Sequence, residues 1–179
     1  RALSILIDIV DLETRPENRL QPAPGDFADL DIQGLLVASP ANPTGTIIPA
    51  AELAAIVRWC DGRGVQLVSD ELYHGLEYPG APATSCAWET SRNPIVVNSF
   101  SKYWAMTGWR LGWLLLPERL RRAVDCLTGN FSICPPTLPQ LAAVAAFSPQ
   151  ALAEADGLVA DYTVNRELLL TGLAEIGLD

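Results

Sequence analysis

The sequence has 179 residues, with 21 aspartates and glutamates against 12 lysines and arginines, and its net charge of -9 argues against a nucleic-acid surface, which needs clustered positive charge. No apolar run is long enough to cross a bilayer and no basic leader precedes an apolar core, so we expect a soluble, cytoplasmic protein without a membrane partner. Because the sequence starts at Arg1 and a strand-like run follows at once, we also expect a piece of a longer protein.

Short apolar and β-branched runs predict five strands. They span residues 3–10, 35–38, 65–69, 95–98 and 111–116. The middle three are apolar nearly throughout, which is typical of strands buried on both faces of a parallel sheet. The connection between the last two strands is barely long enough for a helical crossover, so we expect the last strand to run antiparallel to its neighbour.

The segment between the second and third strands predicts a helix over residues 50–63, with Pro49 at its start and Gly64 just past its end. This strand–helix–strand order predicts a βαβ unit. Later helices are predicted on the surface at 118–127, in an alanine-rich, buried position at 139–147, and at 149–175. Loops are predicted at 11–31 and 79–94, which are rich in proline, glycine, aspartate and serine.

The cysteines and the histidine give no sign of a metal site. Cys60, Cys86, Cys126 and Cys134 are 26, 40 and 8 positions apart, so they form no CxxC pair, and His74 is the only histidine. We therefore expect no bound metal and buried, reduced thiols.

The motif SPANPTG, residues 39–45, follows the strand at 35–38 directly. Its prolines and glycine favour a tight turn in which Asn42 can present its amide at the edge of the sheet, and the Asn42-Pro43 bond can be cis. Taken alone, the motif is also compatible with an ordinary loop.

The motif SDELY, residues 69–73, follows the next strand of the βαβ unit. Asp70 falls at the carboxyl end of that strand, and Tyr73 comes three positions later. Taken alone, Asp70 is as compatible with a helix cap as with a functional carboxylate. We expect Glu71 and His74 to have structural roles.

The stretch NSFSKYWAMTGWRLGW, residues 98–113, contains Lys102, the only lysine of the sequence. Lys102 lies between the hydroxyls of Ser99 and Ser101 and the planar donor group of Arg110. An amine among the aromatic residues of this stretch would be poorly hydrated, which favours the neutral, nucleophilic form. The alternatives are an ordinary surface lysine, a packing role or a phosphate contact.

The three motifs follow strands that we expect to lie in one sheet. Ligands of open α/β sheets bind in the crevice beyond the carboxyl ends of the strands. We therefore expect Asn42, Asp70 and Lys102 to meet at that edge. A nucleotide-binding Rossmann domain is disfavoured because no GxGxxG motif follows a strand.

In order and spacing, the three motifs resemble the large domain of pyridoxal-phosphate-dependent aminotransferases of class I/II, the aspartate aminotransferase superfamily of fold type I. Asn42 and Asp70 are 28 positions apart, and Lys102 and Arg110 are 8 positions apart, which fits that family. The resemblance covers residues 3–147. It is more specific for the cofactor than for the substrate.

The resemblance implies a three-layer α/β/α sandwich with a mostly parallel sheet and one antiparallel strand. Residues 1–148 would be the central part of the cofactor-binding large domain, and residues 149–179 a connector helix toward a small C-terminal domain. The complete protein would be a homodimer. Because the family's phosphate-binding glycine turn, stacking aromatic residue and substrate-binding arginine are missing here, we do not expect these 179 residues to be active alone.

The resemblance also implies pyridoxal 5'-phosphate as the cofactor, with catalysis by Lys102, Asp70 and Tyr73. Lys102 would form a Schiff base with the cofactor aldehyde and later move the substrate Cα proton. Asp70 would keep the pyridine nitrogen protonated so that the ring can accept electrons. Asn42 and Tyr73 would donate hydrogen bonds to the phenolic oxygen.

The cofactor phosphate would be held by Ser99 and Arg110, with Ser101 as an additional donor. Arg110 would be the stronger anchor because its planar group matches phosphate oxygens and stays charged. Trp104 and Trp109 would pack behind the site rather than touch the substrate.

The implied function is transfer of an amino group between an amino acid and a 2-oxo acid by a ping-pong mechanism. The same motifs also serve C–S lyases and cyclopropane-forming synthases. Similar domains also occur fused to DNA-binding modules, as regulators that bind the cofactor without turnover. An amino-terminal helix-turn-helix segment would support a regulator, and an aminotransferase arm would support an enzyme.

Overall fold

The computed structural model describes residues 9–12 and 21–178 of the chain. Most of the predicted strand at 3–10 therefore lies outside the described residues, and its last two residues, 9 and 10, have no regular structure.

A short helix, α1 (Pro24–Phe27), interrupts the segment predicted as a loop at 11–31. Its first residue is a proline, which suits the first turn of a helix because no N–H is needed there. Phe27 is fully buried and packs edge to face on Trp59, with ring centroids 4.8 Å apart. The loop prediction missed this turn because four residues give too little periodicity to recognise.

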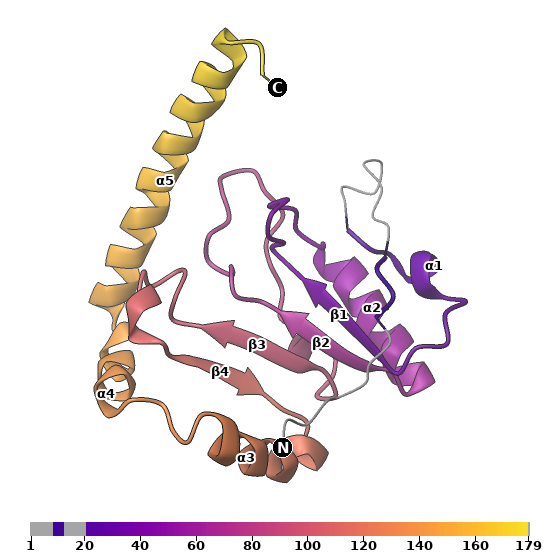
Figure 1. Cartoon of the computed structure of the whole chain (residues 1–179). Coiled ribbons are helices and arrows are strands. Elements are labelled where there is room, and N and C mark those ends of the chain that lie inside the picture. Colours follow the sequence, from indigo (N-terminus) through magenta and orange to yellow (C-terminus); the bar gives the residue numbers. More distant parts are fainter. Residues whose placement is uncertain (1–8, 13–20, 179) are drawn as a thin grey trace.

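The described chain contains one four-stranded sheet, in the order β1-β2-β3-β4 (Figure 1). Its strands are β1 (Gly34–Ala38), β2 (Gln66–Asp70), β3 (Ile95–Ser99) and β4 (Gly112–Leu115). The first three are parallel, and β4 runs antiparallel to β3, as the short connection predicted. Each predicted strand from the second to the fifth is thus confirmed to within one or two residues.

The helix α2 (Ala50–Arg63) has the predicted bounds and completes the βαβ unit between β1 and β2. One face of α2 packs on the sheet to form the main core. The buried residues in this contact are Leu53, Ile56, Val57 and Cys60 of the helix and Leu35, Val37, Leu67 and Val96 of the strands. On the opposite face of the sheet, Leu36 is 69% exposed.

Three helices follow the sheet: α3 (Glu118–Phe131), α4 (Thr137–Ala146) and α5 (Pro149–Glu175). α3 continues past the predicted end at residue 127, and in this extra turn the side chains of Thr128 and Asn130 donate to the helix carbonyls of Val124 and Cys126. α4 begins before its predicted start at residue 139, since a proline in the first turn of a helix removes no needed hydrogen bond.

The prediction that α4 is buried is wrong for most of its surface. Leu138, Leu141 and Val144 are 73%, 65% and 76% exposed. Only the face with Pro139, Ala143 and Ala146 packs inward. Its partners are Phe100, Trp104, Met106, Leu111 and Trp113. An apolar composition shows that a helix can be buried, but not which of its faces has a partner in this chain.

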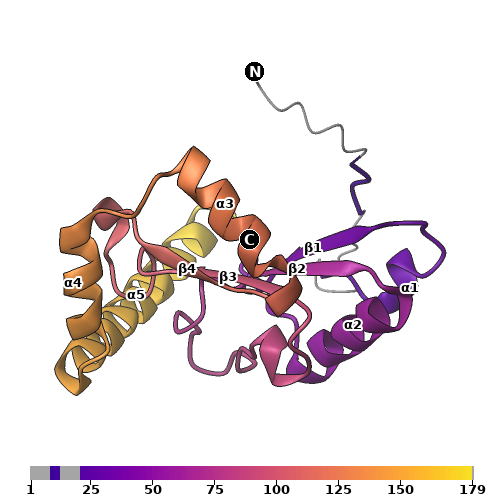
Figure 2. The same ribbon diagram turned by 90° about the horizontal axis from the view of Figure 1, so that it is seen from below.

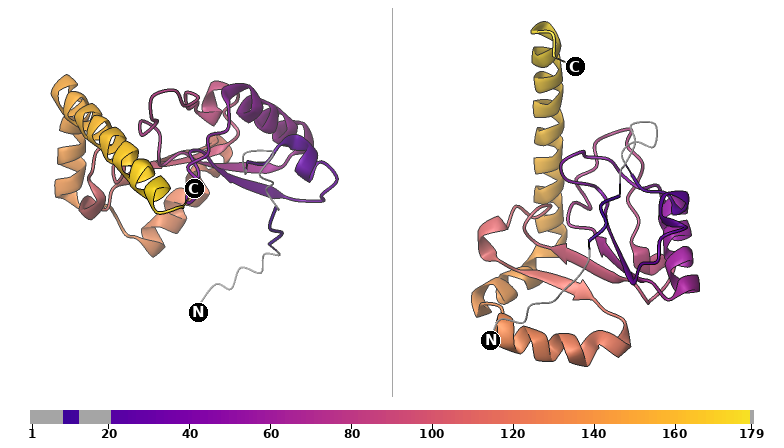
Figure 3. Two further views of the ribbon diagram at one scale, coloured as in Figure 1. Left: turned by 90° about the horizontal axis from the view of Figure 1, so that it is seen from above. Right: turned by 45° about the vertical axis from the view of Figure 1, so that its right-hand side comes forward.

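Helices lie on both sides of the sheet, with α2 on one side and α3 on the other (Figure 2). This arrangement confirms the predicted α/β/α sandwich with a mostly parallel sheet. α5 keeps the predicted bounds and extends far beyond the sheet (Figure 3). Within the described part of the chain, no helix is both long enough and apolar enough to span a membrane.

The expectation of buried thiols is only partly right. Cys60 is buried and Cys86 is half-buried, whereas Cys126 and Cys134 are exposed. Of the two exposed cysteines, Cys126 lies in the second half of α3 and Cys134 in the segment after it.

Two glycines at the end of α2 should change stability in opposite directions when replaced by alanine. An added Cβ at Gly62, inside the helix, has nothing within 4 Å, so Gly62→Ala should raise the free energy of unfolding by about 0.5–1 kcal/mol. Gly64 has φ +70°, so Gly64→Ala should lower it by about 1–2 kcal/mol. Urea unfolding measures both; the same sign of effect for the two variants would contradict this helix end.

Candidate active site

The three polar motifs meet at one edge of the sheet because they follow three neighbouring parallel strands. Ala38 lies opposite Asp70, and Asp70 lies opposite Val97. Beyond the strands, Ser39 N–H donates to the Asp70 carbonyl at 3.0 Å, and Glu71 N–H donates to the Val97 carbonyl at 2.9 Å. The pairing therefore continues into the motifs, and the predicted meeting point is confirmed.

Asp70 ends β2, the central strand of the three. Its Oδ1 accepts a hydrogen bond from Leu72 N–H at 3.1 Å, a local turn contact that orients the carboxylate. Its other oxygen, Oδ2, has no hydrogen-bond partner among the described residues. The carboxylate is half-buried, so it remains accessible to a ligand at this edge.

Asn42, Tyr73 and Lys102 come together although each follows a different strand. Asn42 Nδ2 donates to the Tyr73 hydroxyl at 3.3 Å. Lys102 Nζ lies 5.3 Å from the centroid of the Tyr73 ring, within the range of a cation–π contact. The bond between residues 42 and 43 is cis, as the motif allowed.

The surroundings of Lys102 differ in one respect from the prediction. Lys102 is half-buried, and the ring that its amine approaches is that of Tyr73, from another motif, rather than a ring from its own stretch. Trp104 packs behind the site, where its indole N–H donates to the Ala146 carbonyl at 2.9 Å. Trp109 does not; it is 46% exposed.

Ser99, Ser101 and Arg110 are linked through a residue that the sequence interpretation did not single out, Thr107. Ser101 N–H donates to Ser99 Oγ at 3.2 Å, and Thr107 Oγ1 donates to the Ser101 carbonyl at 2.7 Å. Arg110 Nη1 in turn donates to the Thr107 carbonyl at 2.9 Å. The only signal for Thr107 in the sequence was its hydroxyl side chain, in the stretch between Lys102 and Arg110.

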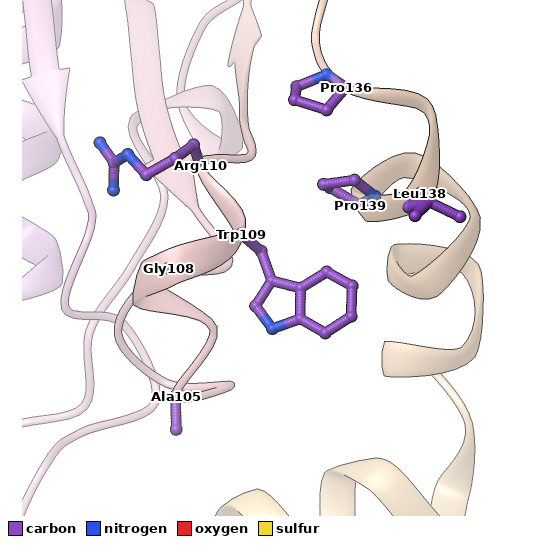
Figure 4. Close-up of a pocket in the computed structure, with 7 residues that line it drawn as sticks. All are labelled: Ala105, Gly108, Trp109, Arg110, Pro136, Leu138 and Pro139. Atoms are coloured by element: carbon purple, nitrogen blue, oxygen red, sulfur yellow. The ribbon is translucent and has the colours of Figure 1, made fainter.

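Trp109 and Arg110 also border a pocket of about 430 Å³ between this turn and the start of α4. Figure 4 shows the Trp109 ring on the side of the turn that faces α4, whereas the Arg110 guanidinium points away from α4. The Arg110 donor group is therefore directed away from this pocket, whose lining is largely apolar.

Glu71 is structural, as predicted, and the structure supplies the partners that the sequence did not show. It is 2% exposed, and its Oε1 accepts from Ser69 Oγ at 3.0 Å and from Ala87 N–H at 2.8 Å. His74 Nδ1 lies 3.7 Å from Oε2. Burial, with a smaller contribution from Glu71, raises the pKa of Cys86 to about 11, so this neighbouring thiol stays protonated at neutral pH.

Comparison with known proteins identifies relatives that align with most of this chain. The valine–pyruvate aminotransferase of Mycobacterium tuberculosis is 64% identical over 174 residues, which are 96% of this chain and 45% of that protein. The aspartate/prephenate aminotransferase of Thermus thermophilus is 33% identical over 175 residues, 95% of this chain and 45% of that protein. The chain thus spans less than half the length of these relatives.

Solved structures agree with the sequence relatives. A crystal structure of an aminotransferase from Mycobacterium tuberculosis superposes with a TM-score of 0.88 at 67% identity, covering 91% of this chain and 43% of that one. Aspartate aminotransferase from Thermus thermophilus with maleate gives 0.87 at 32% identity, covering 95% of this chain and 46% of that one. The sequence profile described as aminotransferase class I and II matches residues 6–179. With this match over nearly its whole length, the chain belongs to the class I and II aminotransferase family.

Proposed function

We propose that the whole protein is a pyridoxal-phosphate-dependent aminotransferase that transfers an amino group between an amino acid and a 2-oxo acid. The observation that carries this proposal is the position of the Lys102 amine, 5.3 Å from the Tyr73 ring centroid at the sheet edge where Asp70 ends β2. Lys102 is the only lysine of the chain, and thus its only side-chain amine. The names of the relatives, which are aminotransferases, support the reaction type.

The set of donors at this edge fits pyridoxal phosphate. It offers an amine for the aldehyde, a carboxylate for the ring nitrogen, a phenol with an amide for the phenolic oxygen, and a guanidinium with serine hydroxyls for the phosphate. When bound, pyridoxal phosphate supplies an aldehyde that condenses with amines and a ring that accepts the electrons left when the substrate Cα loses its proton.

Lys102 would have two tasks. Its amine would first hold the cofactor, and once the substrate has replaced it, Nζ would take the proton from the substrate Cα and give it back later in the reaction. A half-buried amine suits both tasks, because it is less hydrated than a surface lysine yet still reachable by a ligand.

Asp70 would hold the proton on the ring nitrogen. A carboxylate beside that nitrogen favours the protonated, positively charged form of the ring. The bond from Leu72 N–H to Oδ1 would fix the carboxylate, which leaves Oδ2 for the cofactor.

The remaining residues would orient the cofactor. Asn42 and Tyr73 would bind its phenolic oxygen, and their 3.3 Å contact keeps the two donors together. Ser99, Ser101 and Arg110 would bind its phosphate. Arg110 has five N–H donors, so its bond to Thr107 leaves others for phosphate oxygens.

We further propose valine, or another amino acid with a branched aliphatic side chain, as the amino donor and pyruvate as the acceptor, because a relative with 64% identity is named valine–pyruvate aminotransferase. A cytoplasmic homodimer, with residues 1–148 in the large domain and 149–179 as the connector to a small domain, stays our prediction for the whole protein. The names of the relatives do not favour the C–S lyase, the cyclopropane-forming synthase or the regulator.

Replacement of Lys102 should abolish covalent attachment of the cofactor while the protein stays folded. Lys102→Ala removes the amine, and Lys102→Arg keeps a positive charge but not a group that condenses with an aldehyde at neutral pH. After borohydride reduction, mass spectrometry should find the cofactor on the Lys102 peptide of the unsubstituted protein and on neither variant, with circular dichroism as the folding control. An adduct that persists in Lys102→Ala would remove Lys102 from the proposed site.

Replacement of Asp70 should reduce turnover more than cofactor attachment. Asp70→Asn removes the charge that holds the proton on the ring nitrogen, and a hydrogen bond to a charged group is worth about 1.5–3 kcal/mol, so kcat should fall roughly 10- to 100-fold. Asp125→Asn, on the exposed surface of α3, is the matched control and should leave kcat unchanged. Unaltered turnover in Asp70→Asn would contradict the assigned role.

A panel of amino donors and 2-oxo acceptors should identify the substrates. We expect the highest kcat/KM for valine or a similar branched amino acid with pyruvate, measured as alanine formation by mass spectrometry. Aspartate should be a poorer donor. Release of hydrogen sulfide or a thiol from cysteine derivatives, without alanine formation, would favour the lyase instead.

A further inference from the structure

Tyr103, the residue after Lys102, connects the Lys102 turn to the helix α5. Its hydroxyl donates a hydrogen bond to Asp156 Oδ1 at 2.7 Å and lies 3.4 Å from the Leu152 carbonyl oxygen. Burial, followed by the hydrogen bond to Asp156, raises the pKa of Tyr103 to about 12. The hydroxyl therefore keeps its proton and stays a donor at physiological pH.

The ring of Tyr103 also lies against the segment that carries Tyr73. Gly75 has φ +87°, and a Cβ added there would lie 2.6 Å from Cδ2 of the Tyr103 ring. Gly75 comes two residues after Tyr73, whose ring borders the Lys102 amine. Tyr103 is therefore bonded to Lys102 through the backbone, and its ring lies against the segment that carries Tyr73.

The turn around Lys102 is fixed locally by backbone hydrogen bonds, and the side chain of Tyr103 ties it to α5. Ala105 N–H donates to the Lys102 carbonyl at 3.0 Å, and Ala105 has φ +52°. Met106 N–H donates to the Phe100 carbonyl at 3.1 Å. These bonds set the shape of the turn, whereas its placement relative to α5 depends on contacts such as the hydroxyl bond of Tyr103.

We infer that Tyr103 is a positioning residue for Lys102: its hydroxyl bond to Asp156 and its ring contact with Gly75 hold the Lys102 amine beside the Tyr73 ring. This inference rests on the proposed function, in which that amine captures the cofactor. A lysine side chain has large rotamer freedom, and a misplacement of about 1 Å at a reacting group can cost about 100-fold in rate. Holding the backbone of Lys102 restricts where its amine can go.

Tyr103→Phe is the decisive variant because it keeps the ring on Gly75 and removes only the hydroxyl. Capture of pyridoxal phosphate by the cofactor-free whole protein is followed by borohydride quenching and mass spectrometry of the Lys102 peptide. We expect capture to be about 3- to 10-fold slower, the effect of one lost hydrogen bond. Acetylation of Lys102 by acetic anhydride should become faster, because it needs only an accessible amine. A merely structural role would lower the unfolding temperature without these opposite changes.

Substitutions at the other end of the hydrogen bond provide the controls. Asp156→Ala should reproduce Tyr103→Phe, and the double variant should capture no more slowly than either single one, since all of them break the same bond. Asp156→Asn keeps an acceptor oxygen and should stay close to the unsubstituted protein. Tyr78→Phe is the matched tyrosine control, because its ring rather than its hydroxyl contacts α5, 5.2 Å from the Arg166 guanidinium, and it should have no effect.

The outcomes distinguish a positioning role of Tyr103 from a purely structural one. Capture by Tyr103→Phe at the unsubstituted rate, or equal losses in Asp156→Asn and Asp156→Ala, would overturn the positioning role. If Tyr103→Phe fails to fold, the comparison of the two Asp156 variants decides alone. No capture by the unsubstituted protein would refute the proposed function instead, and the acetylation rates would still test whether Tyr103 holds the amine of Lys102.

Discussion

Parallel pairing of β1, β2 and β3 is the constraint on which the candidate site depends. In-register hydrogen bonds bring the carboxyl ends of the three strands to one edge, with Asp70 in the middle. Any polar residue that closely follows one of these strands then arrives at the same place, whatever the length of the connecting segment. This is why Asn42, Tyr73 and Lys102 are neighbours although the sequence separates them widely. The buried Glu71 supports the edge from behind by tying β2 to the segment that precedes β3.

Sequence signals predicted the fold best where they are local. Pro49 and Gly64 mark the ends of α2. The start of α5 also matches its predicted position, and the structure adds the cap there: the Ser148 hydroxyl accepts from Ala151 N–H at 3.2 Å. The antiparallel direction of β4 followed from the length of its connection. The exposure of α4 could not be predicted in the same way, because an apolar face indicates a partner without saying whether that partner lies in these residues.

The candidate site was predictable in outline, because residues at the ends of parallel strands must meet, and the contacts of Asn42 and Tyr73 follow from that rule. The contacts that hold Lys102 were not predictable. Tyr103 and Asp156 are 53 positions apart, and nothing in either local pattern links them, since their contact depends on how α5 crosses the Lys102 turn. The role of Thr107 was not predictable for a related reason: its hydroxyl joins two backbone segments, and the residue type alone does not reveal such a contact.

The ring of Tyr103 fills the space into which a side chain at position 75 would extend. A side chain at position 75 would meet that ring and would also be strained by the φ of +87°, and loss of the phenol would remove the reason for a carboxylate at position 156. Position 75 should therefore stay glycine, and positions 103 and 156 should covary during evolution. A graft of the Lys102 turn onto another scaffold would have to carry the residues at positions 75, 103 and 156 to keep the amine in its position.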